Sequence, residues 1–247
     1  MKLAPLGTTG YHPNELRHTA CYALPEVGVV LDAGTGMFRL PNVLATDELD
    51  IFLSHAHLDH IVGLTFLLGA LYGRSMKRVT VHGAPAKLAA VREHLFHIEI
   101  FPIPLQAEFR PLAAHVNLPK GGVLTHFPLA HPGGSIGYRL DWPDRSLAYV
   151  TDTTAAADAP YLEKIRGVDL LLHECYFDDD APREFVTTTG HSHTSAVAQL
   201  ARSAGVKRLV LIHLNPAINS IDPVGLSAAR RIFPATELAE DCKIIEF

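Results

Sequence analysis

Residues 49–60 read LDIFLSHAHLDH, and this stretch carries the strongest structural signal in the 247-residue chain. Its apolar first half predicts a buried strand, and the apolar residues that follow it predict a helix. Side chains alternate between faces in an extended chain, so His55 and His57 share a face and can hold one metal ion together. Asp59 and His60 follow at the expected start of the helix, close enough to serve a second ion.

Ligand chemistry narrows the choice of metal without settling it. Imidazole and carboxylate groups suit zinc, and they also suit manganese or iron. A single histidine in such a loop would be explained by a helix cap or a hydrogen bond to backbone. Four ligand-type residues within six positions favour a metal site instead.

Further ligands must come from distant parts of the sequence. Polar residues stand just beyond several strand-sized apolar runs, and His131, Asp152 and His213 are the candidates for the remaining positions. A carboxylate at Asp152 can bridge two cations and offset their repulsion. Taken singly, these residues also suit a turn, an Asx-turn or helix cap, and a half-buried histidine. Active sites of α/β proteins are commonly built on loops that follow strands, which favours the ligand interpretation.

The hydrophobic pattern predicts an alternation of short strands and helices in one domain, residues 1–247. Helices are expected at 61–72 and 194–204, with Thr194 or Ser195 as cap of the second, and 85–97 is a third candidate. Prolines punctuate residues 102–119, which predicts irregular structure and a candidate lid. Strands are expected at 27–31, 49–53, 78–82, 124–127, 147–150, 168–172 and 209–212.

Composition limits the class of protein. A hydrophobic content of 48% is enough for a sizeable core, and a net charge of −5 excludes a broad cationic surface for nucleic acid. The basic run 74–78 is small and typical of a solvated face.

No apolar run is long enough to cross a membrane, and no secretory signal opens the chain, so we expect a cytoplasmic protein. Cys21, Cys175 and Cys242 form no CxxC pair and are expected to be buried small hydrophobes in a reducing compartment.

Several stretches resemble the motifs of the metallo-β-lactamase superfamily, and specifically of ribonuclease Z and its relatives, over nearly the whole chain. Residues 32–36, DAGTG, resemble the first motif, whose aspartate braces the metal-binding loop. Residues 54–60 match the second motif, His-x-His-x-Asp-His. The remaining three motifs correspond to His131 with residues 135–139, to Asp152 and to His213.

This resemblance implies both a fold and a complete ligand set. The fold is an α/β (α+β) four-layer αββα sandwich, with two mostly antiparallel or mixed sheets face to face and helices outside. Two divalent metal ions are implied, zinc being expected and manganese or iron being alternatives, and a homodimer is plausible. One ion is held by His55, His57 and His131, the other by Asp59, His60 and His213, with Asp152 bridging them.

Other residues favour the phosphodiesterase branch of the superfamily. Oxygen-reducing relatives replace the histidine at the position of His57 by glutamate, and metallo-β-lactamases usually lack the one at His60. Residues 171–177, LLHECYF, and 190–193, GHSH, resemble the His-Glu-Ala-Thr-Phe and Gly-His-Ser-Thr stretches of ribonuclease Z. The resemblance implies that Glu174 orients His191.

In ribonuclease Z this histidine then donates a proton to the leaving oxygen. Cys175 and His193 depart from the pattern, and His193 is a second donor, a substrate contact or a bystander. Without the resemblance, the ordinary explanations are that Glu174 faces solvent after a strand and that His191 caps the following helix.

The chemistry that these residues suit is hydrolysis of a phosphodiester. Two cations lower the pKa of a bridging water and stabilise charge that builds up on the phosphoryl oxygens. Asp59 can accept or steer the proton of the resulting hydroxide, and an imidazole suits protonation of an alkoxide leaving group.

Substrate size follows from what the chain lacks. Ribonuclease Z carries a long arm between its third and fourth motifs that clamps transfer RNA. Here the residues of these motifs, His131 and Asp152, are only 21 positions apart. This spacing leaves room for one hairpin, formed by residues 136–140 and 147–150. We therefore expect a small or cyclic phosphodiester, or a nucleic-acid end. The alternatives are transfer-RNA 3′ processing, hydrolysis of a thioester or lactone, and a non-catalytic metal-stabilised binding or sensing module.

Overall fold

The predicted strands fall into two seven-stranded sheets, one in each of two units of the chain. The computed structural model describes residues 1–247. Unit 1 comprises Met1–Pro13, Arg17–Ala113 and Glu240–Phe247, and unit 2 comprises Asn14–Leu16 and Ala114–Ala239. That the chain acts as one domain stays a prediction.

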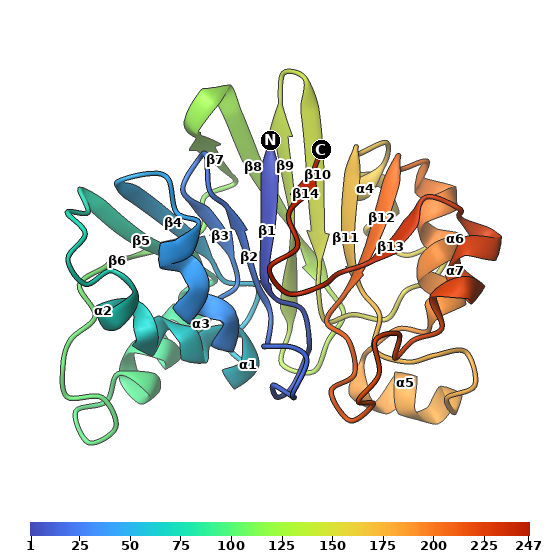
Figure 1. Ribbon diagram of the computed structural model, residues 1–247, viewed down its shortest axis with the longest axis horizontal. Helices are drawn as coiled ribbons and strands as arrows, with labels where there is room; N and C mark the ends of the chain where they lie inside the picture. The colour runs from blue at the N-terminus through green and yellow to red at the C-terminus, as the bar shows by residue number, and fades with distance from the viewer. The chain divides into compact units, whose positions relative to one another are not determined.

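The sheet of unit 1 has the strand order β14-β1-β2-β3-β4-β5-β6 (Figure 1). Its first half is antiparallel, and the pairs from β3 to β6 are parallel. Valine, isoleucine and leucine dominate the central parallel strands, as expected for strands that are buried on both faces. The strands are β1 Lys2–Gly7, β2 Cys21–Leu24, β3 Val29–Leu31, β4 Glu48–Phe52, β5 Arg78–Gly83, β6 Glu108–Pro111 and β14 Ile245–Glu246.

The helix predicted at 61–72 is interrupted and begins earlier, at Leu58. Gly63 explains one break, because its N–H bonds to the carbonyl of Ala33, 2.7 Å away, and a Cβ at this glycine would meet the carbonyl oxygen of Gly34 at 2.1 Å. The candidate at 85–97 is also shorter than predicted. The helical segments of unit 1 are the 3₁₀ segment η1 Thr35–Asn42, α1 Leu58–Ile61, the 3₁₀ segment η2 Val62–Phe66, α2 Leu67–Ala70, α3 Pro85–Ala90 and the π-helical turn η3 Val91–Leu95.

The sheet of unit 2 repeats this mixed pattern, with the order β13-β12-β11-β10-β9-β8-β7. The pairs from β7 to β10 are antiparallel and those from β10 to β13 are parallel. The predicted hairpin is confirmed, since β9 and β10 pair with Trp142 opposite Arg145. The strands are β7 His115–Leu118, β8 Gly122–Leu129, β9 Ser135–Trp142, β10 Arg145–Val150, β11 Leu170–Glu174, β12 Arg208–Ile212 and β13 Thr236–Leu238.

The helix predicted at 194–204 is confirmed as α6 Thr194–Ala204, which ends before Gly205 in the left-handed conformation with φ 61°. The predicted cap was wrong, because Asp179 does the capping: its carboxylate accepts the Ser195 N–H at 2.8 Å. The side chain of Thr194 instead bonds to backbone carbonyls. The other helical segments of unit 2 are the 3₁₀ turn η4 Pro119–Gly121, α4 Leu162–Ile165, α5 Arg183–Thr189 and α7 Leu226–Ile232.

Each unit has its own apolar core between sheet and helices. In unit 2 the apolar face of α6, including Val197 and Leu200, packs with Leu171 and Leu209 of the sheet, and all four are fully buried. Full burial of one such side chain stabilises the fold by roughly 1.5–3 kcal/mol. In unit 1 a corresponding cluster joins the strands to η1, α1 and α3. These cores hold the strand ends from which the polar side chains project.

Residues 102–119 are more regular than predicted. They contain β6 and β7, which form one edge of each sheet. Pro111 is tolerated at the end of β6 because an edge strand need not donate every backbone hydrogen bond. No helix of the chain has the length and the apolar character needed to cross a bilayer.

Candidate metal centre

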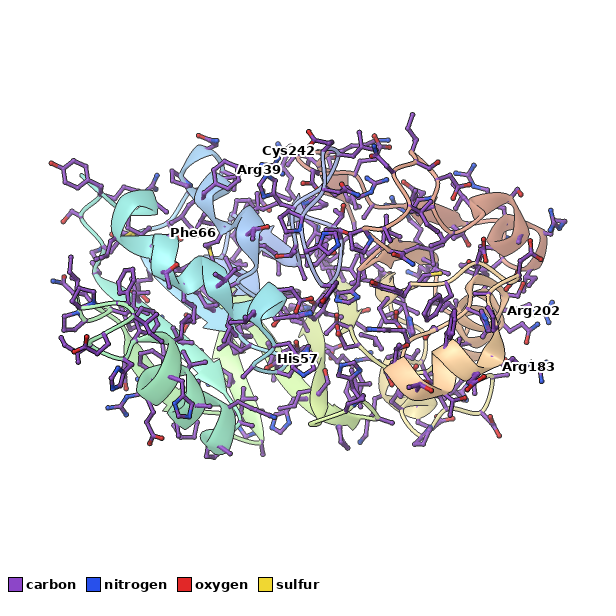
Figure 2. All side chains as sticks on the ribbon, turned by 90° about the horizontal axis from the view of Figure 1, so that it is seen from below. Arg39, His57, Phe66, Arg183, Arg202 and Cys242 are labelled. Atoms are coloured by element: carbon purple, nitrogen blue, oxygen red, sulfur yellow. The ribbon has the colours of Figure 1, made fainter.

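The cluster of unit 1 follows β4 and runs into α1. Figure 2 labels His57, which lies at the start of α1, and this residue is exposed whereas His55, Asp59 and His60 are buried. The Nε2 atom of His55 is 3.0 Å from Nδ1 of His57, and Nε2 of His60 is 3.2 Å from a carboxylate oxygen of Asp59. One short loop thus gathers four predicted ligands.

Asp32 braces this loop from the end of β3. Its carboxylate accepts hydrogen bonds from the backbone N–H and the hydroxyl of Ser54, both 2.7 Å away, and it contacts Nδ1 of His60 at 2.8 Å. Nδ1 of His55 in turn lies 2.9 Å from the Ser54 hydroxyl oxygen. These contacts occupy Nδ1 of both imidazoles and leave Nε2 for a metal ion, as partners behind metal-binding histidines usually do. The bracing role that the resemblance implied for Asp32 agrees with this geometry.

A backbone contact from a distant loop also holds Asp59. The N–H of Tyr11 donates to its carboxylate at 2.7 Å, and Tyr11 has a φ of 57°, which is uncommon for a residue other than glycine. Nothing in the sequence around Tyr11 indicated this contact, since the donor is a main-chain group.

The cluster of unit 2 is assembled from the ends of several strands. Asp152 follows β10, His213 follows β12, and His131 lies in the turn between β8 and β9. The carboxylate of Asp152 is 3.3 Å from Nε2 of His213 and 3.6 Å from Nε2 of His131. The Thr151 hydroxyl contacts the same carboxylate, and Nδ1 of His131 lies 3.2 Å from the carbonyl oxygen of Gly190.

His191 stands beside this cluster. Its ring nitrogen belongs to a group with ligand atoms of Asp152 and His213, all within 4.8 Å of one another. Nδ1 of His191 is 3.6 Å from a carboxylate oxygen of Glu174, which is fully buried at the end of β11. Neither oxygen of Glu174 accepts a hydrogen bond from another protein group, so the carboxylate is available to His191. Glu174 therefore does not face solvent, and His191 does not cap α6, which begins after His193.

A buried hydrogen-bonded pair fixes the backbone at Glu174. Nδ1 of His173 lies 2.7 Å from the carbonyl oxygen of Glu174, and its Nε2 lies 2.9 Å from the hydroxyl of Tyr161. Burial lowers the pKa of His173, and burial together with the nearby charge of Glu174 raises the pKa of Tyr161. His173 is thus a neutral imidazole that donates from Nδ1 and accepts from the tyrosine.

Two of the residues that depart from the ribonuclease Z pattern, His193 and Cys175, have structural partners. Nε2 of His193 lies 2.9 Å from the carbonyl oxygen of Ala181, and His193 is not part of the ligand groups. Cys175 is buried and packs with its thiol 3.3 Å from the Thr194 hydroxyl. Cys21 is buried as expected, but Cys242 is exposed, so the expectation of three buried cysteines was wrong for the last one.

Backbone strain occurs at two predicted ligands and at the brace Asp32. Asp32, Asp152 and His213 have positive φ angles of 57°, 31° and 52°, and each lies within two residues of the end of a strand. Residues other than glycine occupy this region at an energetic cost, which is commonly met at functional sites. In open α/β sheets, ligands bind beyond the carboxyl ends of the strands.

The spacing of ligand atoms within each cluster fits divalent metal ions. Two ligands of a tetrahedral zinc ion lie roughly 3.4 Å apart, since each is about 2.0–2.1 Å from the metal. The four contacts between neighbouring ligand atoms, two in each unit, are 3.0 to 3.6 Å long. Imidazole and carboxylate donors at this spacing fit zinc, manganese or iron.

Comparison with known sequences establishes the class of protein. The family model of the β-lactamase superfamily domain matches residues 28–214, a span that includes every predicted ligand, and the chain belongs to this family. Ribonuclease Z of Salinibacter ruber (strain DSM 13855 / M31) is 29% identical, and the match covers 98% of this chain and 93% of that protein. Ribonuclease BN of Escherichia coli O17:K52:H18 (strain UMN026 / ExPEC) is 28% identical, with 98% of both proteins covered.

Solved structures confirm the predicted fold class, a metallo-β-lactamase fold with two mixed sheets flanked by helices. YhfI of Bacillus subtilis, a metallo-β-lactamase fold protein, superposes with a TM-score of 0.82 at 19% identity, and 99% of each chain is covered. The short form of human tRNase Z gives a TM-score of 0.78 at 21% identity, with 100% of this chain and 99% of that chain covered. Family membership and the His and Asp clusters together support a metal-dependent hydrolase, and the clusters are consistent with a binuclear metal site.

Proposed function

We propose that this protein is a dinuclear metal-dependent phosphodiesterase that acts on a small or cyclic phosphodiester or on a nucleic-acid end. The ligands that we propose for this centre are those that the resemblance to known motifs implied. One ion is held by His55, His57 and His131, the other by Asp59, His60 and His213, and Asp152 bridges them. Zinc is the metal that we propose, with manganese or iron as the alternatives that the ligands also suit.

The observation that carries the proposal is the position of His191 beside Glu174. Hydrolysis of a lactone or thioester by a dinuclear centre does not require a separate proton donor. A phosphodiester with an alkoxide leaving group does, because the alkoxide is strongly basic. A nitrogen of His191 lies within 4.8 Å of ligand-type atoms of Asp152 and His213, and its Nδ1 is 3.6 Å from the buried carboxylate of Glu174.

Each residue has a separate task in this mechanism. When bound, the two cations supply a hydroxide near neutral pH and stabilise negative charge on the phosphoryl oxygens. Asp59, held by the N–H of Tyr11, accepts or steers a proton at its carboxylate. Glu174 holds His191 by its Nδ1 edge, and His191 protonates the leaving oxygen from Nε2.

The small size of the substrate follows from features of this chain. The segment between His131 and Asp152 forms only the hairpin β9–β10. The basic run 74–78 offers little free charge, because Lys77 contacts Asp47 at 2.7 Å and Arg78 contacts Asp50 at 2.6 Å. The alignment with ribonuclease Z of Salinibacter ruber extends over 303 positions, more than the 247 residues of this chain, so that relative carries insertions that are missing here.

Transfer-RNA 3′ processing is the second candidate. It is favoured by similarity to ribonucleases Z and BN over 98% of the chain. Processing without the arm would require another way to hold the body of the transfer RNA.

The decisive experiment is hydrolysis of bis(p-nitrophenyl) phosphate by metal-loaded protein, with a lactone and a thioester assayed in parallel. We expect turnover of the diester and a loss of at least about 100-fold in Asp59→Ala, the range in which general acid–base groups contribute. Cyclic nucleotides and a transfer-RNA precursor are then compared as natural substrates. Turnover of the lactone or thioester alone would overturn the phosphodiesterase assignment, and no turnover of any ester would favour the non-catalytic module.

His191→Ala and His193→Ala form a matched pair for the same assay. Both histidines lie in one short stretch, but only His191 belongs to a ligand group, whereas His193 contacts a backbone carbonyl. We expect His193→Ala to keep near wild-type activity and His191→Ala to lose activity, although only modestly on bis(p-nitrophenyl) phosphate. Because p-nitrophenolate leaves without protonation, the loss in His191→Ala should be larger with an alkoxide leaving group.

A further inference from the structure

Tyr176 covers one face of the proposed proton donor. Its ring stacks on that of His191 with centroids 4.6 Å apart and planes inclined by only 14°. The two neighbouring histidine rings, His131 and His213, lie farther from His191, at 5.2 and 5.3 Å, and are more strongly tilted. Tyr176 is therefore the aromatic neighbour that lies flat against His191.

Backbone hydrogen bonds keep the two rings in this arrangement. Tyr176 and Phe177 direct their N–H groups to the carbonyl oxygen of Ser192, at 3.3 and 3.1 Å. Ser192 directly follows His191, so the segment that carries Tyr176 is bonded beside the imidazole. The hydroxyl of Ser192 is buried and bonded to backbone on both sides, to Ala155 N–H and to the Thr153 carbonyl oxygen. The segment with Tyr176 and the segment with His191 are thus both held by hydrogen bonds within unit 2.

Glu174 alone does not determine how the imidazole is oriented. A contact of 3.6 Å between its carboxylate and Nδ1 limits the distance at one edge of the ring. It leaves rotation of the ring about this contact possible. A flat neighbour on one face removes this freedom, because offset stacking favours near-parallel planes. The contact of Glu174 at the ring edge and that of Tyr176 on the ring face together fix the direction in which Nε2 of His191 points.

We propose that Tyr176 is a positioning residue for His191, an inference that rests on the phosphodiesterase function proposed above. In the His-Glu-Ala-Thr-Phe pattern that residues 173–177 resemble, threonine stands at this position and has no planar face. With tyrosine here, His191 is held ready to protonate a basic leaving group. The protein is accordingly adapted to phosphodiesters whose leaving oxygen depends on that proton.

The test compares two methyl aryl phosphates, one with p-nitrophenol and one with unsubstituted phenol as leaving group. In Tyr176→Thr we expect kcat for the phenyl ester to fall about tenfold, part of the roughly 100- to 10,000-fold contribution of a positioned general acid. KM and turnover of the p-nitrophenyl ester should change by less than about twofold. Tyr176→Phe keeps the ring and should retain wild-type behaviour, whereas Tyr176→Leu, which preserves side-chain bulk, should behave like the threonine variant.

A second readout does not depend on activity. In metal-free protein, the ring protons of His191 should show an upfield ring-current shift by NMR in the wild type and in Tyr176→Phe, and lose it in Tyr176→Thr. Equal losses on both esters, or an unchanged His191 shift, would overturn the positioning role. If wild-type protein hydrolyses neither ester, the proposed function fails, and the NMR comparison still decides whether Tyr176 orients His191.

Discussion

The two units place predicted metal ligands at similar points of similar sheets, but they assemble them in different ways. Unit 1 takes its four predicted ligands from one stretch of six residues after β4. Unit 2 takes His131, Asp152 and His213 from a turn and two strand ends that are far apart in sequence. A local cluster depends on the conformation of one loop. A dispersed cluster depends on the pairing of β10, β11 and β12, where a shift of one residue would turn the side chains to the other face.

Equivalent aspartates of the two sheets have different tasks. Asp32 follows β3 and Asp152 follows β10, the first strands of the parallel halves, and both have positive φ angles. Asp32 accepts hydrogen bonds from Ser54 and contacts the Nδ1 side of His60. Asp152 instead contacts the Nε2 atoms of His131 and His213, which are predicted ligands. The same backbone arrangement therefore supplies a brace in one unit and a predicted ligand in the other.

The largest expected effect tests whether the two clusters form one centre. His55→Ala in unit 1 and His131→Ala in unit 2 should each lower diesterase activity on the order of 1000-fold, since in the proposed centre each removes a ligand of the same ion and cations contribute several kcal/mol. The double variant should be little worse than the single ones, because residues that act as a unit are not additive. Activity is measured together with metal content by mass spectrometry.

Multiplicative losses in the double variant would show that the two histidines serve different ions. Loss of one metal equivalent in each single variant and of both in the double variant would lead to the same conclusion. His193→Ala provides the control for a histidine of unit 2 outside the ligand groups.

A smaller effect is expected from the brace of unit 1. In Asp32→Asn an NH2 group replaces one of the two carboxylate oxygens that accept from Ser54 and His60. Zinc affinity measured by calorimetry should therefore fall roughly 10- to 100-fold. Asp50→Asn is the matched control. Asp50 is also a buried carboxylate of this sheet, and it contacts His82 at 2.8 Å. This variant should lose stability but keep wild-type zinc affinity, and equal losses in both variants would contradict a specific bracing role for Asp32.

How much the sequence could predict differs between the same two regions. The loop 54–60 was readable because its ligands are contiguous and stand between a strand and a helix. The helix after it was predicted as continuous, since the hydrophobic period does not record that Gly63 bonds to Ala33. The ligands of unit 2 needed the resemblance to known motifs, because each has an ordinary explanation when taken singly. Both sets lie within the span that the family model matches.

Some features had no sequence pattern that could reveal them. Strand β1 was not predicted because it contains Pro5 and Gly7, where a bulge shifts the pairing with β2. The stacking of Tyr176 on His191 and the capping of α6 by Asp179 join side chains through tertiary structure. Hydrophobic periodicity reports burial along one element, and it carries no information about which polar groups meet across elements.

The smallest expected effect concerns the dependence of stability on pH, and it separates Asp50 from the metal clusters. Burial alone would raise the pKa of Asp50, but hydrogen bonds from Arg78 and His82, with their charges, lower it to about 2. A carboxylate whose pKa is lower in the folded state stabilises the fold at pH values above its unfolded pKa of about 3.9, and this contribution disappears as the pH falls towards 2. The contribution is on the order of 2 kcal/mol. In urea unfolding of metal-free protein, the stability difference between wild type and Asp50→Asn should therefore shrink by about this amount between pH 5 and pH 2. A difference that stays constant over this range would show that the charge of Asp50 is not what stabilises unit 1.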